Sequence, residues 1–129
     1  METGTEQKII LSFINDKSPI LDLTCDDLIA SGIKVLFRSE SIEDGLFQLS
    51  TLKTLPKVCI IDLDFYDKQI LAKLQKFRIE YSNVKLIAHT DIDNGTVGKI
   101  LLDIGFSSCL LVGSDADDFK KAIDKAVNG

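Results

Sequence analysis

The stretch from Lys57 to Asp64 constrains the fold more than any other part of the sequence. Its centre is a run of four apolar residues, Val58 to Ile61, which is too short for a helix and is typical of a strand buried on both faces in a parallel sheet. Two carboxylates, Asp62 and Asp64, follow at once. In open α/β sheets, ligands bind at the carboxyl ends of the strands, so Asp62 is the first candidate functional residue. The equal alternative is that Asp62 only caps the next turn.

The rest of the chain alternates in the same manner between apolar stretches and segments with helical spacing. Further strands are predicted over residues 8–14, 33–37, 84–88 and 109–112. The first predicted helix has Ser18 as its N-cap and Pro19 as its first residue, and it ends at Gly32. The second begins at Ser41 with Asp44 and closes at Pro56, and the third spans Ile70 to Tyr81. The fourth runs from Val97 to Gly105, and the fifth begins at Ser114 with Asp117. We therefore expect a single α/β domain over residues 1–129, with a doubly wound, five-stranded parallel sheet in the flavodoxin-like order 2-1-3-4-5.

Composition excludes several classes of protein. The 129 residues carry 15 basic and 20 acidic side chains, and this net charge of −5 disfavours direct binding to nucleic acid. The three cysteines form no C-x-x-C pair and are expected to be reduced core residues. No apolar run approaches the length of a membrane span, and the first residues do not resemble a signal peptide. The expected location is the cytoplasm.

Polar residues follow several of the predicted strands. In the order 2-1-3-4-5, the first and third strands are neighbours, so Asn15, Asp16, Asp62 and Asp64 are expected to converge, with Thr90 at the end of the next strand. Clustered oxygen ligands of this kind suit Mg²⁺, which leaves room for a phosphate. A carboxylate beside such an ion can also act as a nucleophile towards phosphorus.

With these residues in five βα units, the whole chain resembles a response regulator receiver domain, the phosphoacceptor module of two-component signalling. The resemblance implies that Asp62 is phosphorylated and that Asp16 and Asn15 stand at the two acidic positions of a Mg²⁺ site. It implies a metal ligand in the backbone carbonyl of Asp64 and a switch hydroxyl in Thr90, which contacts the phosphoryl group. The implied partner is a sensor histidine kinase or a phosphotransfer protein. The domain is then no enzyme beyond self-catalysed phosphotransfer and dephosphorylation.

The sequence also departs from the pattern of that family. Where the family has a lysine after the fifth strand, this sequence has Val112. The replacement removes a charge-assisted contact worth about 1.5–3 kcal/mol. Where the family has a small residue after the switch hydroxyl, this sequence has Asp91, whose negative charge would repel a phosphoryl group. The aromatic switch position is Cys109, and the proline after the lysine is Gly113. Asn15 in place of an acid weakens the metal site.

Two functions remain open within the receiver resemblance. Asp62 accepts a phosphoryl group, or the domain is a degenerate receiver that serves as a phosphorylation-independent interaction module. In either case, the resemblance suggests a homodimer or partner surface made by the fourth helix, the fifth strand and the fifth helix. It also allows a DNA-binding output domain on a longer chain or on a partner.

Two other classes of protein are weaker alternatives. A haloacid-dehalogenase-like phosphatase would use Asp62 as nucleophile and Asp64 as acid and base, but it would carry this motif on its first strand. A flavodoxin would need a glycine-rich phosphate cradle where the sequence has an acidic turn. His89, the only histidine, is expected to be a satisfied structural residue without a catalytic role.

Overall fold

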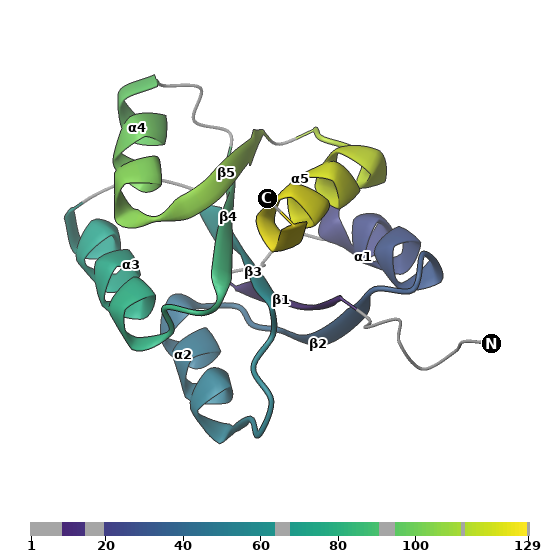
Figure 1. Ribbon diagram of the computed structural model, residues 1–129, viewed down its shortest axis with the longest axis horizontal. Coiled ribbons are helices and arrows are strands. Elements are labelled where there is room, and N and C mark those ends of the chain that lie inside the picture. Colours follow the sequence, from purple (N-terminus) through teal and green to yellow (C-terminus); the bar gives the residue numbers. More distant parts are fainter. Residues whose placement is uncertain (1–8, 15–19, 64–67, 91–94, 112, 129) are drawn as a thin grey trace.

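Five strands and five helices alternate along the described part of the chain (Figure 1). The computed structural model describes residues 9–14, 20–63, 68–90, 95–111 and 113–128. The elements are β1 (Ile10–Ile14), α1 (Ile20–Ala30), β2 (Lys34–Arg38), α2 (Ile42–Thr51), β3 (Val58–Leu63), α3 (Lys68–Glu80), β4 (Lys85–Thr90), α4 (Gly95–Ile104), β5 (Phe106–Leu111) and α5 (Ala116–Asn128).

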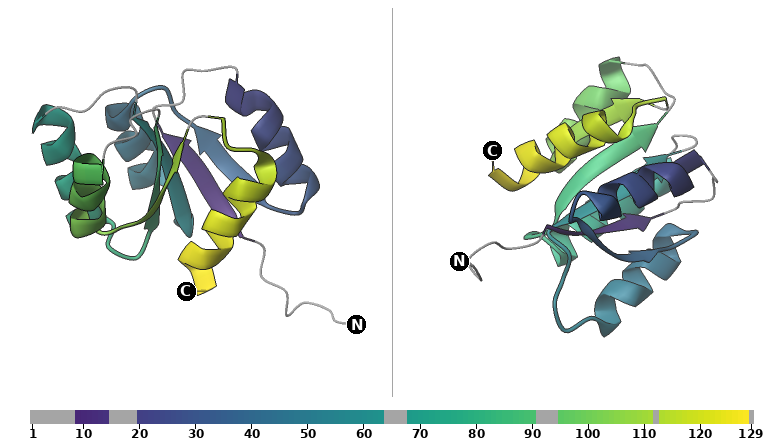
Figure 2. Two further views of the ribbon diagram at one scale, coloured as in Figure 1. Left: turned by 90° about the horizontal axis from the view of Figure 1, so that it is seen from above. Right: turned by 90° about the vertical axis from the view of Figure 1, so that its right-hand side faces the viewer.

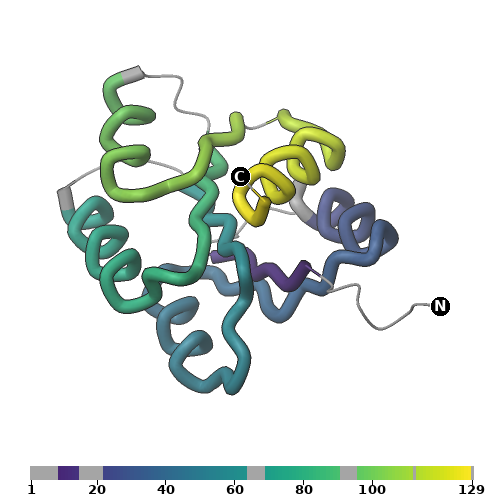
Figure 3. Tube along the Cα trace, viewed as in Figure 1, coloured from purple at the N-terminus to yellow at the C-terminus, as the bar shows by residue number. Residues whose placement is uncertain are grey.

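The strands form one parallel sheet in the order β2-β1-β3-β4-β5. This is the order that the sequence predicts. β3 lies at the centre and pairs with β1 on one side and with β4 on the other. The chain trace in Figure 3 shows how the connections return the chain over the sheet after each strand. The switch in winding direction falls between β1 and β3, where fold rules place the ligand crevice.

Helices cover both faces of the sheet, with α1 and α5 on one face and α2, α3 and α4 on the other (Figure 2). β3 supplies apolar side chains to both layers. Cys59, Ile61 and Leu63 pack against α2, α3 and α4, whereas Val58 and Ile60 pack against α1 and α5. All six residues of β3 are buried, as the apolar run predicts.

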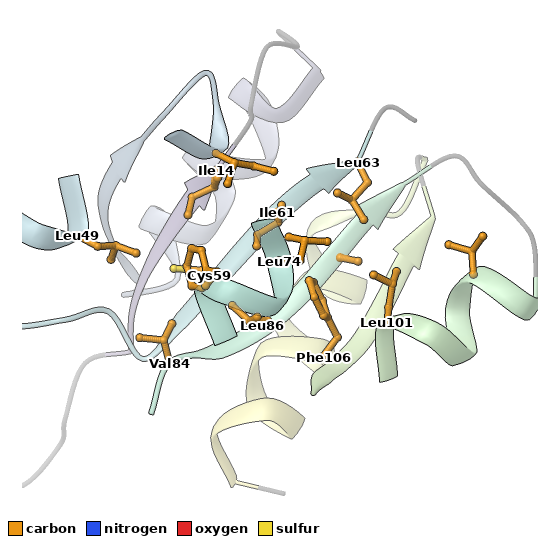
Figure 4. Packing of buried hydrophobic residues seen from close by; sticks show 14 residues of the cluster. Ile14, Leu49, Cys59, Ile61, Leu63, Leu74, Val84, Leu86, Leu101 and Phe106 are labelled. Atoms are coloured by element: carbon orange, nitrogen blue, oxygen red, sulfur yellow. The ribbon is translucent and has the colours of Figure 1, made fainter. Parts of the chain in front are cut away.

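The larger of the two cores lies under α2, α3 and α4 (Figure 4). Leu49 from α2, Leu74 from α3 and Leu101 from α4 meet Ile61 and Leu86 from the central strands. These side chains are no more than 1 % exposed. Each of these three helices thus buries apolar side chains against the sheet.

The predicted starts of the fifth strand and of the last helix are wrong. The fifth strand begins at Phe106, three residues before the predicted start, because Phe106 and Ser108 pair with Leu86 and Ile87 of β4, with a register irregularity between them, although the two serines interrupt the apolar run. The last helix is capped by Asp115, whose carboxylate accepts from the N–H of Asp118 at 2.9 Å, while the N–H of Asp115 donates to Asp118 at 3.1 Å. This reciprocal pair replaces the predicted cap at Ser114 and Asp117.

Two other predicted helix ends are confirmed. The hydroxyl of Ser41 accepts a hydrogen bond from the N–H of Asp44 at the start of α2. Gly105, directly after α4, has φ +122°, a conformation that L-residues with a side chain rarely adopt. The predicted close of the second helix at Pro56 is wrong, because α2 already ends at Thr51, five residues earlier. The predicted cap at Ser18-Pro19 lies outside the described residues.

Within the described ranges, no helix combines the length and the apolar character that crossing a membrane requires.

We expect opposite effects from adding one methyl group to each of two helical glycines. A Cβ at Gly45 in α2 would lie 2.8 Å from Cγ1 of the buried Ile14, whereas a Cβ at Gly98 in α4 would meet no atom within 4 Å. Gly98→Ala should raise the free energy of unfolding by about 0.5–1 kcal/mol, since alanine favours helix. Gly45→Ala should lower it by about 1–2 kcal/mol, because overpacking outweighs that gain. Urea titrations measure both changes, and a stabilised Gly45→Ala would contradict this packing.

The three thiols should react in two classes. Cys25 and Cys59 are buried, and burial raises the pKa of the Cys59 thiol, whereas Cys109 is exposed. A thiol reagent should label one cysteine quickly in the folded protein, and Cys109→Ser should abolish that reaction. Partial desolvation also raises the pKa of the Cys109 thiol, so less thiolate is present at neutral pH and the labelling rate should still rise above pH 9. Fast labelling of two thiols without denaturant would contradict the assignment.

Candidate functional site

Asp62 is the charged residue of the central strand. It is the fifth residue of β3 and only 7 % exposed, among side chains that otherwise build the two cores. Burying an ionised carboxylate costs free energy unless other groups compensate it, and the packing of β3 does not require a carboxylate. This favours a functional role for Asp62 at the carboxyl end of the strand. The alternative role as a cap of the following turn involves residues 64–67, which lie outside the described ranges.

The ends of three strands meet beside Asp62. Ile14, the last residue of β1, pairs with Ile61, and Thr90, the last residue of β4, pairs with Leu63. Thr90 is 3 % exposed. The structure thus brings Thr90 to the same edge of the sheet as Asp62, as the sequence predicts.

His89 lies next to Asp62 across the strand pair. The two residues are direct partners in the register of β3 and β4, and Nδ1 of His89 lies 3.5 Å from Oδ1 of Asp62. The side chains of His89 and Asp62 are 5 % and 9 % exposed. The imidazole Nδ1 has no hydrogen-bond partner among the described residues, and such a buried orphan costs about 1–3 kcal/mol. The expectation of a satisfied structural histidine is therefore wrong.

Strand alternation separates the two polar residues at the end of β4. Ile87 packs against α1 and α5 and Ala88 against α2, α3 and α4, so His89 shares a face with Ile87 and Thr90 shares a face with Ala88. Consistent with this, the His89 ring lies 5.3 Å from the ring of Phe119 in α5, with an angle of 46° between the planes. Asp62 and His89 therefore face the α1 and α5 layer together.

Five residues singled out in the sequence lie outside the described ranges: Asn15, Asp16, Asp64, Asp91 and Val112. The predicted metal site depends on three of them. The described residues alone bring no three His, Cys, Asp or Glu side chains together as metal ligands. The Mg²⁺ site stays a prediction from the sequence, with Asp62 as its described member.

Two departures noted in the sequence have structural counterparts near β5. Cys109 pairs with Ala88 of β4 and is exposed, so a small thiol stands where an aromatic ring is expected from the resemblance. Gly113 has φ +102°. A proline, whose φ is fixed near about −65°, would not fit this backbone, which explains the glycine.

Comparison with known proteins gives structural matches only. No family model matches the sequence, and no curated protein matches it either. A response regulator from Thermotoga maritima matches with a TM-score of 0.82 and 15 % identity, covering 95 % of this chain and 100 % of that one. A CheY-like response regulator receiver domain protein from Methanospirillum hungatei matches with a TM-score of 0.76 and 20 % identity, covering 95 % of each chain.

A protein that is not named as a response regulator has the same architecture. A putative CpaE2 pilus assembly protein from Sinorhizobium meliloti matches with a TM-score of 0.77 and 18 % identity, covering 91 % of this chain and 98 % of that one. At these identities the matches establish the fold alone, and the chemistry has to be inferred from the residues of this chain. The sheet order, the helix layers and the full-length matches agree, and the chain has the fold of a response regulator receiver domain.

Proposed function

We propose that this protein is a phosphoacceptor domain of a two-component phosphorelay, in which Asp62 receives a phosphoryl group from a histidine kinase or a phosphotransfer protein. One observation carries the proposal. A buried carboxylate stands at the carboxyl end of the central strand, at the switch point of a receiver fold. The core gains nothing from a charge at this position, whereas phosphoryl transfer to a carboxylate requires one.

The proposed acceptor needs a cation to offset the charge of the incoming phosphoryl group. Mg²⁺ prefers hard oxygen ligands, and Asp62, Asp16, Asn15 and the backbone carbonyl of Asp64 are the groups that would hold it. Bound there, the ion would neutralise charge on the phosphoryl oxygens. Thr90, at the end of β4, is the proposed hydroxyl donor to the phosphorylated side chain.

An interaction module without phosphorylation is the second candidate. It is favoured by Val112 and Asp91 in the sequence, and by the exposed Cys109 where an aromatic switch residue is expected.

Phosphorylation of Asp62 distinguishes the two candidates. Incubation with Mg²⁺ and acetyl phosphate should add the mass of one phosphoryl group to the intact protein, and EDTA should prevent the addition. Asp62→Asn should abolish it, because an amide is a poor nucleophile. Asp26→Asn, which removes an exposed carboxylate from α1, is the matched control and should react as the wild type does.

The opposite result has a clear meaning. If neither acetyl phosphate nor a panel of histidine kinases modifies the wild-type protein, the phosphoacceptor function is wrong and the interaction module stands. Modification that persists in Asp62→Asn would place the acceptor elsewhere.

The proposed homodimer surface consists of α4, β5 and α5. Leu102 of α4 is 54 % exposed and Leu111 of β5 is 47 % exposed, so apolar side chains are available on this side of the molecule. Burial of such side chains on association supplies a favourable free energy of about 25 cal/mol per Å².

We expect Leu102→Asp to weaken self-association by at least about tenfold, since a charge would be buried at the centre of the interface. Phe47→Asp, on the exposed face of α2, is the control, because Phe47 is 67 % exposed and lies outside the proposed surface. Sedimentation equilibrium with Mg²⁺ and acetyl phosphate present measures both. Equal weakening by the two variants, or a wild type that stays monomeric at all concentrations, would contradict this surface.

A further inference from the structure

The imidazole of His89 has one buried nitrogen, Nδ1, that forms no hydrogen bond with the described part of the chain. The His89 side chain is 5 % exposed. Buried polar atoms in folded proteins nearly always have a partner, and an exception calls for an explanation such as a function or a missing ligand. The nearest candidate partner is Oδ1 of Asp62, 3.5 Å away.

Two further described neighbours of His89 are apolar. Phe119 of α5 packs on the ring, and Leu110 of β5 is the register partner on the side opposite Asp62. Leu110 belongs to the apolar layer beneath α1 and α5. Among the described residues, Asp62 is the one ionisable group that His89 contacts. The ring is therefore held by packing, with Nδ1 directed to the proposed phosphoacceptor.

We propose that His89 is a positioning residue for Asp62: its Nδ1–H donates to the carboxylate before phosphorylation and to a phosphoryl oxygen afterwards. This inference rests on the function proposed above. The separation of 3.5 Å is just beyond an ordinary N–H···O bond, so a small rotation of either side chain would form it. The N–H of His89 thus lies beside the proposed phosphoacceptor Asp62. In this sequence Val112 stands where receiver domains have a lysine.

The donor acts on the transfer without entering it. One carboxylate oxygen of Asp62 forms the new bond to phosphorus while the bond from phosphorus to the acyl oxygen of acetyl phosphate breaks. Acetate leaves with that electron pair, so no proton or redox partner is needed. The N–H of His89 keeps its hydrogen throughout. It orients Oδ1 and leaves the second oxygen as the nucleophile, and it later offsets charge on the phosphoryl group.

Three substitutions separate positioning from packing. Asparagine places its amide nitrogen where Nδ1 of histidine lies, glutamine extends its amide towards the place of Nε2, and leucine supplies no donor. At one fixed pH, with Mg²⁺ and acetyl phosphate, His89→Leu should slow phosphorylation of Asp62 by about tenfold to a hundredfold, the usual effect of losing a hydrogen bond to a charged group. His89→Gln should resemble His89→Leu, and His89→Asn should stay within about threefold of the wild type.

Folding and function are kept apart in this design. His89→Asn and His89→Gln both bury an amide at the same place, so a difference between their rates at matched thermal stability reports on the position of the donor. Equal rates for these two variants, or a wild-type rate in His89→Leu, would overturn the proposal for His89 while Asp62 remains a working phosphoacceptor. A wild-type protein that is never phosphorylated would overturn both proposals.

A second readout uses the fact that His89 is the only histidine. Its imidazole gives a single set of ring nitrogen signals in NMR spectra of protein with ¹⁵N-labelled histidine. Addition of Mg²⁺ with beryllofluoride, an analogue of a phosphoryl group on a carboxylate, should shift the Nδ1 signal and slow the exchange of its proton. The shift should vanish in Asp62→Asn. An Nδ1 signal that beryllofluoride leaves unchanged, in a protein that binds it, would contradict the contact.

Discussion

The burial of β3 on both faces is the constraint on which the rest of the structure depends. All six of its residues are buried, and its side chains alternate between the two cores. A strand covered in this way needs neighbours on both edges and helices on both faces, which the βα units before and after it supply. The same burial gives Asp62 its character. At the end of a buried strand, a carboxylate is shielded from water by its neighbours. An exposed carboxylate would not differ from the other acidic side chains on the surface.

Much of the architecture could be predicted because local and global signals agree in this chain. The apolar run before Asp62, the cap at Ser41 and the glycine after α4 each indicate an element that the structure contains. The predictions failed where short patterns are ambiguous. Ser114 with Asp117 and Asp115 with Asp118 have the same spacing, and only the backbone of the last helix selects the second pair. The polar start of β5 also escapes a reading of apolar runs, because it is the pairing of Phe106 and Ser108 with β4 that extends the strand through the two serines.

His89 could not be identified from the sequence for a different reason. Alternation along β4 indicates which residues share its face, but the neighbour across the sheet depends on the register between β3 and β4. A shift of one residue would turn the imidazole to the other face of the sheet. Apolar pairs such as Cys59 with Leu86 and Ile60 with Ile87, three and two residues before the pair of Asp62 and His89, continue the same register. The contact between His89 and Asp62 is thus set by hydrophobic packing elsewhere in the sheet.

The close approach of Gly45 to Ile14 links a surface helix to the polar edge of the sheet. Ile14 ends β1, and Asn15 and Asp16 follow it directly in the sequence. Because three atoms of the Ile14 side chain lie within 3.0 Å of the place where a Cβ at residue 45 would stand, the two positions share one fixed volume. A larger side chain at residue 45 therefore competes for space with Ile14, so the effects of substitutions at the two positions on stability are coupled. The end of β1, which Asn15 and Asp16 follow in the sequence, is therefore packed against a helix that carries none of the proposed site residues.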